Sequence, residues 1–161
     1  MIRLATPADL SALIELDRAS SSAAHWTERQ YLQTLHPEES GPHRLVIVTE
    51  DVLPVPSDAT LKATAEIHGF LVARHLAPEW ELENIVVAPG ARRNGLGSRL
   101  LEALVVKAGE TNSEAVFLEV RESNIAARTL YEKAGFGRTG RRKAYYTNPP
   151  EDAVLYRLRL A

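Results

Sequence analysis

The segment Arg92-Arg93-Asn94-Gly95-Leu96-Gly97-Ser98 has the residue types and spacing of an anion-binding loop. Glycines let the backbone approach a ligand closely, and the unpaired N–H groups at the start of a helix attract negative charge. The spacing fits neither the P-loop pattern GxxxxGK followed by Ser or Thr nor the dinucleotide pattern GxGxxG. The segment therefore predicts a phosphate-binding loop of another kind. The alternative is a tight turn from strand to helix that holds no ligand.

Three glutamates are candidate bases for a proton transfer. Glu119 is the only carboxylate in the apolar run 115–120, and a carboxylate that loses solvent becomes a stronger base. Glu81 and Glu83 stand two residues apart in a strand-like stretch, so their side chains share one face. A plainer interpretation stays open for each. Glu119 can point to solvent, and the other two can attract a basic acceptor or only solvate the strand.

Hydrophobic periodicity and capping residues predict the elements that hold these groups. Strands are expected at residues 2–4, 44–49, 63–73, 80–88 and 115–120, with two more in the tail around 145–146 and 154–158. Helices are expected after Thr6-Pro7, after the capping box Thr27-Glu28-Arg29-Gln30, over 96–108 and after Ser123-Asn124. Residues 51–60 begin with two prolines and two aspartates among eight residues, which predicts an exposed, mobile hairpin loop.

The order of these elements predicts one domain over residues 1–161 with an α/β (α+β) fold. We expect a mixed, mainly antiparallel sheet. It is antiparallel at its start and tail, has a parallel crossover in the middle, and is flanked by about four helices.

Composition excludes several kinds of site. The chain has 161 residues, of which 45% are hydrophobic and 25% charged. It has no cysteine, so a thiol nucleophile, a thiolate zinc site and CxxC redox chemistry are excluded. The five histidines show no HExxH or comparable spacing, so we expect no metal.

Charge and hydropathy bear on partners and location. The formal net charge of −2 argues against a DNA-binding protein, although residues 121–143 hold seven basic and two acidic residues. That segment either faces coenzyme phosphates or RNA, or it is a solvated surface. The sequence shows no signal-peptide core and no apolar run of membrane-spanning length. We therefore expect a soluble cytoplasmic protein without a membrane partner, and the oligomeric state stays open.

The loop and its surroundings resemble one enzyme family. The run Arg92–Gly97 resembles the R/Q-x-x-G-x-G/A signature of the GNAT acyl-CoA-dependent N-acetyltransferases, whose loop amides hold the pyrophosphate of coenzyme A. Glu83-Asn84-Ile85-Val86-Val87 looks like that family's fourth strand, and residues 123–127 with 130–136 look like its final helix motif. The resemblance implies acetyl-CoA as co-substrate. It implies coenzyme contacts at Ile85, Val86, Val87, Arg92, Arg93, Asn94, Gly95, Leu96, Gly97, Ser98 and Asn124.

The same resemblance implies roles in the transfer itself. Glu119 is implied as the base and Tyr131 as the acid near the coenzyme sulfur. Glu81 or Glu83 is an alternative base, and Tyr131 can instead be a core tyrosine. Asn124 can act only as a helix cap. Because an acetyl thioester is already activated and the chain has no cysteine to acylate, we expect direct attack by the acceptor amine in a ternary complex.

Three further stretches resemble a narrower branch of this family, which acetylates the N-terminal alanine of a ribosomal protein. They are residues 118–124, residues 141–146 with 151–153, and His25-Trp26-Thr27-Glu28, where His25 replaces a usual proline. The implied acceptor is the N-terminal alanine α-amine of a small-subunit ribosomal protein. The alternatives are acetylation of a small-molecule amine or a lysine, a non-catalytic acyl-CoA-binding module, and RNA binding through the basic segment.

Overall fold

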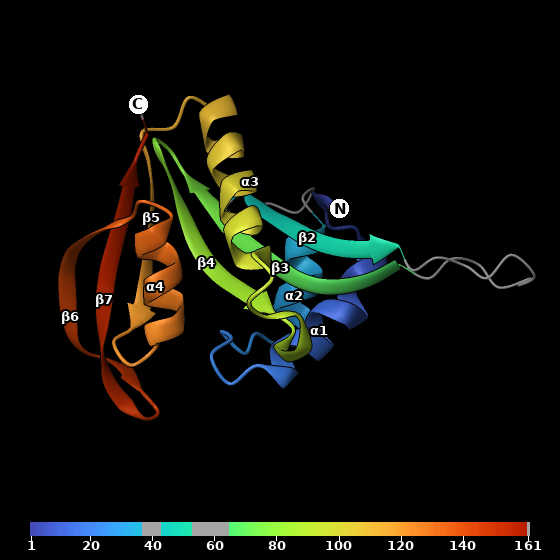
Figure 1. Ribbon diagram of the computed structural model, residues 1–161, viewed down its shortest axis with the longest axis horizontal. Coiled ribbons are helices and arrows are strands. Elements are labelled where there is room, and N and C mark those ends of the chain that lie inside the picture. Colours follow the sequence, from blue (N-terminus) through green and yellow to red (C-terminus); the bar gives the residue numbers. More distant parts are fainter. Residues whose placement is uncertain (37–42, 53–64, 161) are drawn as a thin grey trace, which may run out of the picture.

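A seven-stranded sheet built from the described residues organises the protein (Figure 1). The computed structural model describes residues 1–36, 43–52 and 65–160. In chain order the elements are β1 (Ile2–Leu4), the 3-10 turn η1 (Pro7–Asp9), α1 (Leu10–Ala19), α2 (Glu28–Leu35), β2 (Arg44–Val52), β3 (Ala65–Leu76), β4 (Glu79–Val87), the 3-10 turn η2 (Pro89–Ala91), α3 (Leu96–Glu110), β5 (Ala115–Arg121), α4 (Ile125–Lys133), β6 (Gly137–Thr147) and β7 (Pro150–Arg159). The strand order is β1-β2-β3-β4-β5-β7-β6.

The predicted mixed sheet is confirmed. β4 and β5 pair in parallel through the crossover helix α3, and the other five pairings are antiparallel. The parallel ladder is short, because it joins residues 79–82 only to residues 115–118. Beyond Leu82 and Leu118 the two strands no longer pair. Among the described residues, the edge of β4 from Glu83 onward therefore has no strand partner on the β5 side.

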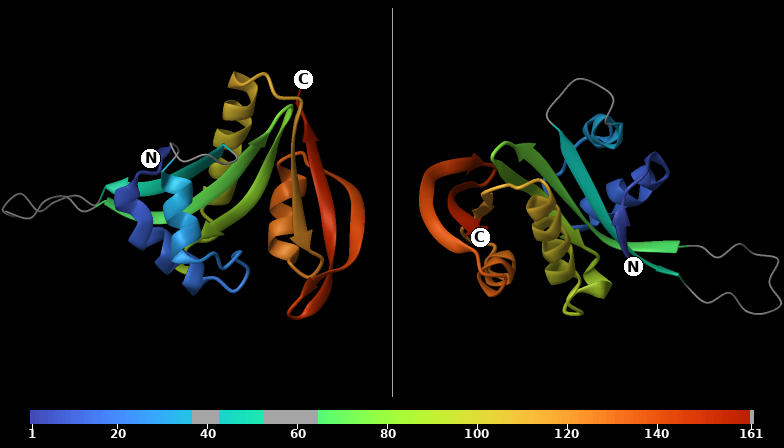
Figure 2. Two further views of the ribbon diagram at one scale, coloured as in Figure 1. Left: turned by 180° about the vertical axis from the view of Figure 1, so that it is seen from behind. Right: turned by 90° about the horizontal axis from the view of Figure 1, so that it is seen from above.

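Helices cover both faces of the sheet (Figure 2). α1 and α2 lie on one face, where Leu13, Tyr31 and Phe70 form part of a buried cluster. α3 and α4 lie on the other face, over a larger core that includes Trp80 and Leu104. Burial of apolar side chains on both faces is the main stabilising contribution to such a layered arrangement.

A bulge in β4 changes which face its side chains occupy. Val72 of β3 pairs with Asn84 while the next residue, Ala73, pairs with Leu82, so Glu83 is the extra residue. A bulge interrupts the alternation of a strand. Leu82 therefore belongs to the core beneath α3, whereas Val86, four residues later, belongs to the core beneath α1 and α2.

Local signals for helix ends are mostly confirmed. The Thr27 hydroxyl accepts a hydrogen bond from the Gln30 amide at 3.2 Å, and the Thr27 amide donates to Gln30 Oε1 at 2.7 Å. Asn124 caps α4 by accepting a hydrogen bond from the Ala127 amide at 3.2 Å. The Thr6-Pro7 signal is followed by the short turn η1 before α1 begins at Leu10.

Two strand boundaries differ from the prediction. β6 begins at Gly137, well before residue 145, because Gly137 pairs with Arg157 of β7 and such long-range pairing leaves no local pattern. The loop predicted at residues 51–60 begins later, since Asp51 and Val52 belong to β2 and pair with residues 66 and 65. The rest of that predicted loop, with its expected mobility, lies outside the described residues.

A buried polar network joins α1, α2 and β4. The Asp17 carboxylate is 2% exposed and accepts hydrogen bonds from the Tyr31 hydroxyl and, at 3.2 Å, from the Trp26 amide. Asn84 Nδ2 donates to the same tyrosine hydroxyl at 3.1 Å. Burial and the hydrogen bond to Asp17 raise the pKa of Tyr31, so its hydroxyl stays protonated as a donor.

Tyr31→Phe is expected to lower the free energy of unfolding by about 2 kcal/mol, because it leaves a buried carboxylate short of a donor. Denaturant unfolding measures this difference. Tyr145→Phe is the matched control, since Tyr145 is 47% exposed and its substitution should change stability little. Equal stability of the Tyr31 variant and the unsubstituted protein would contradict the assigned network.

Candidate active site

The start of α3 has the backbone geometry of an anion-binding loop. Gly95 is the residue before the helix and has φ of +75°, a left-handed conformation that glycine adopts without strain. Arg93 also has a positive φ, of +65°. The amides of residues 96–98 occupy the first turn of α3, where N–H groups have no partner within the helix. This geometry supports the predicted phosphate-binding loop.

The residues around this loop make different contacts within the protein. Arg92 folds back, with Nε 3.3 Å from the Val87 carbonyl oxygen and Nη2 3.4 Å from the Ser20 hydroxyl. Asn94 Nδ2 donates to the Ala91 carbonyl at 3.3 Å and so braces the loop itself. A Cβ on Gly97 would lie 2.9 Å from Leu130 Cδ2 of α4. Close packing of α3 on α4 is thus a reason for this glycine, in addition to ligand approach.

Gly95→Ala is expected to destabilise the protein by about 1 kcal/mol, the cost of holding an L-residue in the left-handed region. It should also raise KM for a phosphate-bearing ligand, since the loop amides would move. Gly90→Ala is the matched control, because a Cβ at either position meets nothing within 4 Å and only Gly95 has a positive φ. Thermal unfolding of both variants measures the difference. Equal losses of stability would contradict the conformational explanation.

Glu119 lies where β4 and β5 part. It is the first residue after Leu118, the last β5 residue that pairs with β4, and its side chain is 17% exposed. Arg142 Nε lies 3.2 Å from Glu119 Oε1. Tyr145 approaches from β6, and hydrogen bonding to the Glu119 carboxylate raises the pKa of Tyr145. Glu119 therefore faces the groups of the tail hairpin, so the plain solvent-facing interpretation is wrong.

Tyr131 is buried in α4, with 5% exposure, and packs against Phe136 and Tyr156 at ring-centroid distances of 5.9 and 6.1 Å. Burial raises the pKa of Tyr131 well above that of a solvated tyrosine, with a smaller contribution from Tyr146. Burial and the nearby Glu119 carboxylate raise the pKa of Tyr146 to about 12. The Glu119 carboxylate thus acts on the ionisation of Tyr146, and Tyr146 acts on that of Tyr131.

The two alternative bases have close cationic partners. Arg74 Nη2 lies 2.5 Å from Glu81 Oε2, and Arg74 Nε lies 3.4 Å from Glu83 Oε1. Arg44 Nε lies 2.9 Å from Glu83 Oε2. These arginines are 29% and 28% exposed, whereas Arg142 beside Glu119 is 57% exposed. An exposed ion pair opens more readily, so the pair between Glu119 and Arg142 is the one of these that opens with least cost.

Several residues that were predicted to contact the coenzyme also stabilise the fold. Val86 is buried beneath α1 and α2, and Ile85 and Val87 pack against the other core, so these side chains stabilise the fold. Their main chain lies on the part of β4 that has no β5 partner. The Asn124 side-chain oxygen serves as a helix cap. Both proposed uses of Asn124 remain compatible, because its amide nitrogen is not needed for the cap.

The sequence did not predict that Tyr145 and Arg142 lie beside Glu119 or that Tyr146 stacks on Arg121. The adjacent tyrosines were a visible signal in the tail, but only the β6–β7 pairing brings them to Glu119. The basic segment 121–143 also presents less unpaired positive charge than its composition indicates. Arg142 pairs with Glu119, and Arg141 pairs with Glu122 and Asp152, the latter at 3.3 Å.

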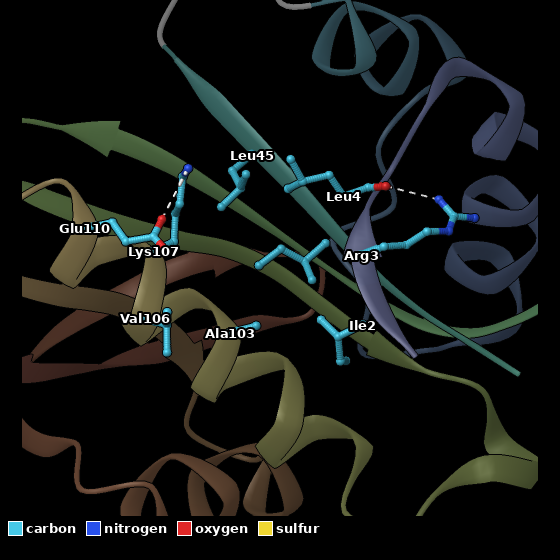
Figure 3. A pocket seen from close by; sticks show the side chains of 9 residues that line it. Ile2, Arg3, Leu4, Leu45, Ala103, Val106, Lys107 and Glu110 are labelled. Carbon is cyan, nitrogen blue, oxygen red and sulfur yellow. Dashed lines mark hydrogen bonds and ion pairs between the residues drawn. The ribbon is translucent and has the colours of Figure 1, made fainter.

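A hollow lies between β1, β2 and α3 (Figure 3). Its lining is largely apolar, and Lys107 Nζ pairs with Glu110 Oε2 at 3.6 Å at its rim. The Arg3 side chain extends toward the Leu4 carbonyl oxygen and also pairs with Asp9 at 2.8 Å. The charged groups of this hollow are thus already paired, and no tyrosine is among the described residues that line it.

Two kinds of feature are absent from the described residues. No group of three or more His, Asp or Glu side chains is arranged there to hold a metal ion. No helix in the described ranges combines the length and apolar content needed to cross a bilayer.

Residues 13–136 match the profile of the acetyltransferase (GNAT) family. Over 100 residues the chain is 37% identical to the ribosomal protein bS18-alanine N-acetyltransferase of Escherichia coli K12, a match that spans 61% of this chain and 68% of that protein. The crystal structure of the ribosomal-protein-S18-alanine N-acetyltransferase from Escherichia coli has a TM-score of 0.76 and 28% identity, over 100% of this chain and 94% of that chain. Arabidopsis thaliana NAA60 in complex with acetyl-CoA has a TM-score of 0.81 at 16% identity, over 99% and 98% of the two chains, a likeness of fold.

Proposed function

Because the chain belongs to the GNAT acetyltransferase family, we propose that it transfers the acetyl group of acetyl-CoA to the N-terminal alanine α-amine of ribosomal protein bS18. The observation that carries this proposal is the placement of Glu119, at the parting of β4 and β5 and beside the tyrosines of the tail hairpin. The acceptor follows from the similarity to the bS18-alanine acetyltransferase. It implies a cytoplasmic site of action.

The residues present fit acetyl-CoA. The α3 amides of residues 96–98, with Arg92 and Arg93 beside them, suit a pyrophosphate. The unpartnered edge of β4 at residues 85–87 suits the pantetheine amides, which can pair with it as an added strand does. Bound acetyl-CoA supplies an activated acetyl thioester. The protein's part is then to hold it, to present a neutral amine, and to protonate the departing sulfur.

Glu119 and Tyr131 have the properties those proton transfers need. Glu119 takes a proton from the acceptor ammonium, directly or through water, when its exposed partner Arg142 gives way. The neutral amine attacks the thioester carbonyl, and Tyr131 gives its proton to the sulfur as the C–S bond of the tetrahedral intermediate breaks. Burial raises the pKa of Tyr131, so this hydroxyl is protonated at neutral pH. An α-amine has an ordinary pKa of about 8, against about 10.4 for lysine, so one carboxylate is adequate as the base.

The test is an acceptor panel with purified protein and acetyl-CoA. It contains a peptide with the bS18 N-terminal sequence, the same peptide with its N-terminus blocked, lysine peptides and polyamines. Thiol release measures turnover, and mass spectrometry locates the acetyl group. We expect acetylation of the free α-amine and none of the blocked peptide, which is the matched control.

Other outcomes of this panel overturn parts of the proposal. Acetylation of the blocked peptide, or of polyamines alone, would keep the reaction but replace the acceptor by a lysine or a small-molecule amine. Tight coenzyme binding without turnover on any acceptor would replace the enzyme by a non-catalytic acyl-CoA-binding module.

A further inference from the structure

We propose that Arg121 is a positioning residue that holds Tyr146 and the β6–β7 turn against the end of β5 that carries Glu119. This inference rests on the proposed function, because it concerns the same site. Arg121 is the last residue of β5 and lies two residues after Glu119, on the same face of the strand. Its side chain makes no ion pair with the described carboxylates and is instead directed at the turn.

Arg121 contacts both the aromatic ring of Tyr146 and the main chain of the turn. The guanidinium carbon lies 4.2 Å from the centroid of the Tyr146 ring, a cation–π contact. Nη1 donates to the Pro149 carbonyl at 3.1 Å, and Nη2 donates to the Asn148 carbonyl at 3.3 Å. A planar guanidinium can stack and donate in two directions at once, whereas a lysine ammonium cannot reproduce all three contacts.

The turn needs these side-chain contacts because β6 is irregular just before it. Arg142 pairs with Ala153 and Tyr146 with Glu151, so three β6 residues, 143–145, face the single residue Asp152. Ala144 has φ of +49°, and its amide donates to the Asp152 carboxylate at 2.8 Å. A bulge of this kind lacks the regular ladder of hydrogen bonds, so side-chain contacts decide its shape.

A separate contact keeps the hairpin attached when Arg121 is absent. The Ser123 hydroxyl lies 2.5 and 2.7 Å from the two Glu151 carboxylate oxygens and so ties the segment after β5 to the start of β7. Loss of Arg121 is therefore expected to loosen the turn without unfolding the sheet. What changes is the position of Tyr146, the residue whose ring contacts Arg121 and whose neighbour in the chain, Tyr145, packs edge-on against it.

A double-mutant cycle tests whether Arg121 acts through Tyr146. Arg121→Ala is expected to lower kcat/KM for the acceptor peptide between about 10- and 100-fold, the size of effect that misplaced groups produce. KM for acetyl-CoA should not change, and Arg121→Lys should recover only part of the loss. In the Tyr146→Leu background, Arg121→Ala should cost clearly less than it does in the unsubstituted protein, because the effects of coupled residues are not additive. Additive losses in the two backgrounds would overturn the proposal.

Hydrogen exchange provides a readout that does not depend on turnover. Arg121→Ala should speed amide exchange in residues 143–148 while leaving α3 unchanged. Arg159→Ala is the matched control, since Arg159 lies opposite Ala115 at the other end of the β5–β7 pairing. Unchanged exchange at the turn would overturn the positioning role. A wild-type protein without turnover on any amine would overturn the proposed function instead, and exchange would still decide the role of Arg121.

Discussion

Glu119→Gln is expected to lower kcat by about 100- to 10,000-fold, the range that a general base contributes. The glutamine side chain has nearly the same shape but cannot accept the proton that leaves the acceptor amine. Acetyl-CoA affinity should stay the same, since the residues proposed to hold the coenzyme lie on β4, the loop before α3 and α4. The fall should therefore be seen in kcat with saturating coenzyme.

The pH profile provides a second measurement for Glu119. If a lost base is responsible, raising the pH should partly restore the rate of Glu119→Gln, because more of the acceptor amine is then neutral before it binds. Glu114→Gln is the matched control: this glutamate is exposed and immediately precedes β5. A loss of less than about threefold in Glu119→Gln would contradict the base assignment and favour Glu81 or Glu83.

Tyr131→Phe is expected to lower kcat by about 100-fold or more while barely changing stability. Within the described residues the Tyr131 hydroxyl has no hydrogen-bond partner, so phenylalanine preserves the packing against Phe136 and Tyr156 and removes only the proton donor. Steady-state kinetics and thermal unfolding of the same variant measure the two effects separately.

Tyr156→Phe is the matched control for this variant. Tyr156 is also buried, but its hydroxyl donates to Glu132 at 2.7 Å and accepts from Arg128 at 3.1 Å. Its substitution should therefore cost stability rather than turnover, the reverse of Tyr131→Phe. If both variants lose stability and activity together, Tyr131 is a core tyrosine and the acid lies elsewhere.

The alkaline limb of the rate profile follows from the sign of the Tyr131 shift. Burial raises its pKa, so the protonated acid persists beyond about pH 10, where a solvated tyrosine ionises. Loss of this acid should therefore not limit kcat between about pH 7 and pH 10. A falling limb in that range that disappears in Tyr131→Phe would contradict the assignment.

Local signals in the sequence were sufficient for most elements. The Thr27 capping box, the Asn124 cap and the left-handed Gly95 before α3 each depend on residues at most three positions apart. Short-range hydrogen bonds and backbone preferences act before any tertiary contact forms, so the order of residues is enough to predict them. The glycine loop between a strand and a helix was predictable for the same reason.

Strand boundaries and the bulges were not predictable in this way. β6 extends back to Gly137 because β7 is available to pair with it, and Glu83 is bulged because β3 skips it. Both features depend on the register between distant segments, which is set by side-chain packing on the faces of the sheet.

The sequence by itself determined the family pattern, the glycine loop before α3 and the identity of Glu119 and Tyr131 as candidates. Only the tertiary structure decided their surroundings: Arg142 and Tyr145 beside Glu119, Arg74 against both alternative bases, and Arg121 beneath Tyr146. The physical reason is the distance along the chain over which each effect acts. Capping and turn preferences act within a few residues, whereas the charge and solvation around a side chain depend on whatever the folded sheet brings next to it.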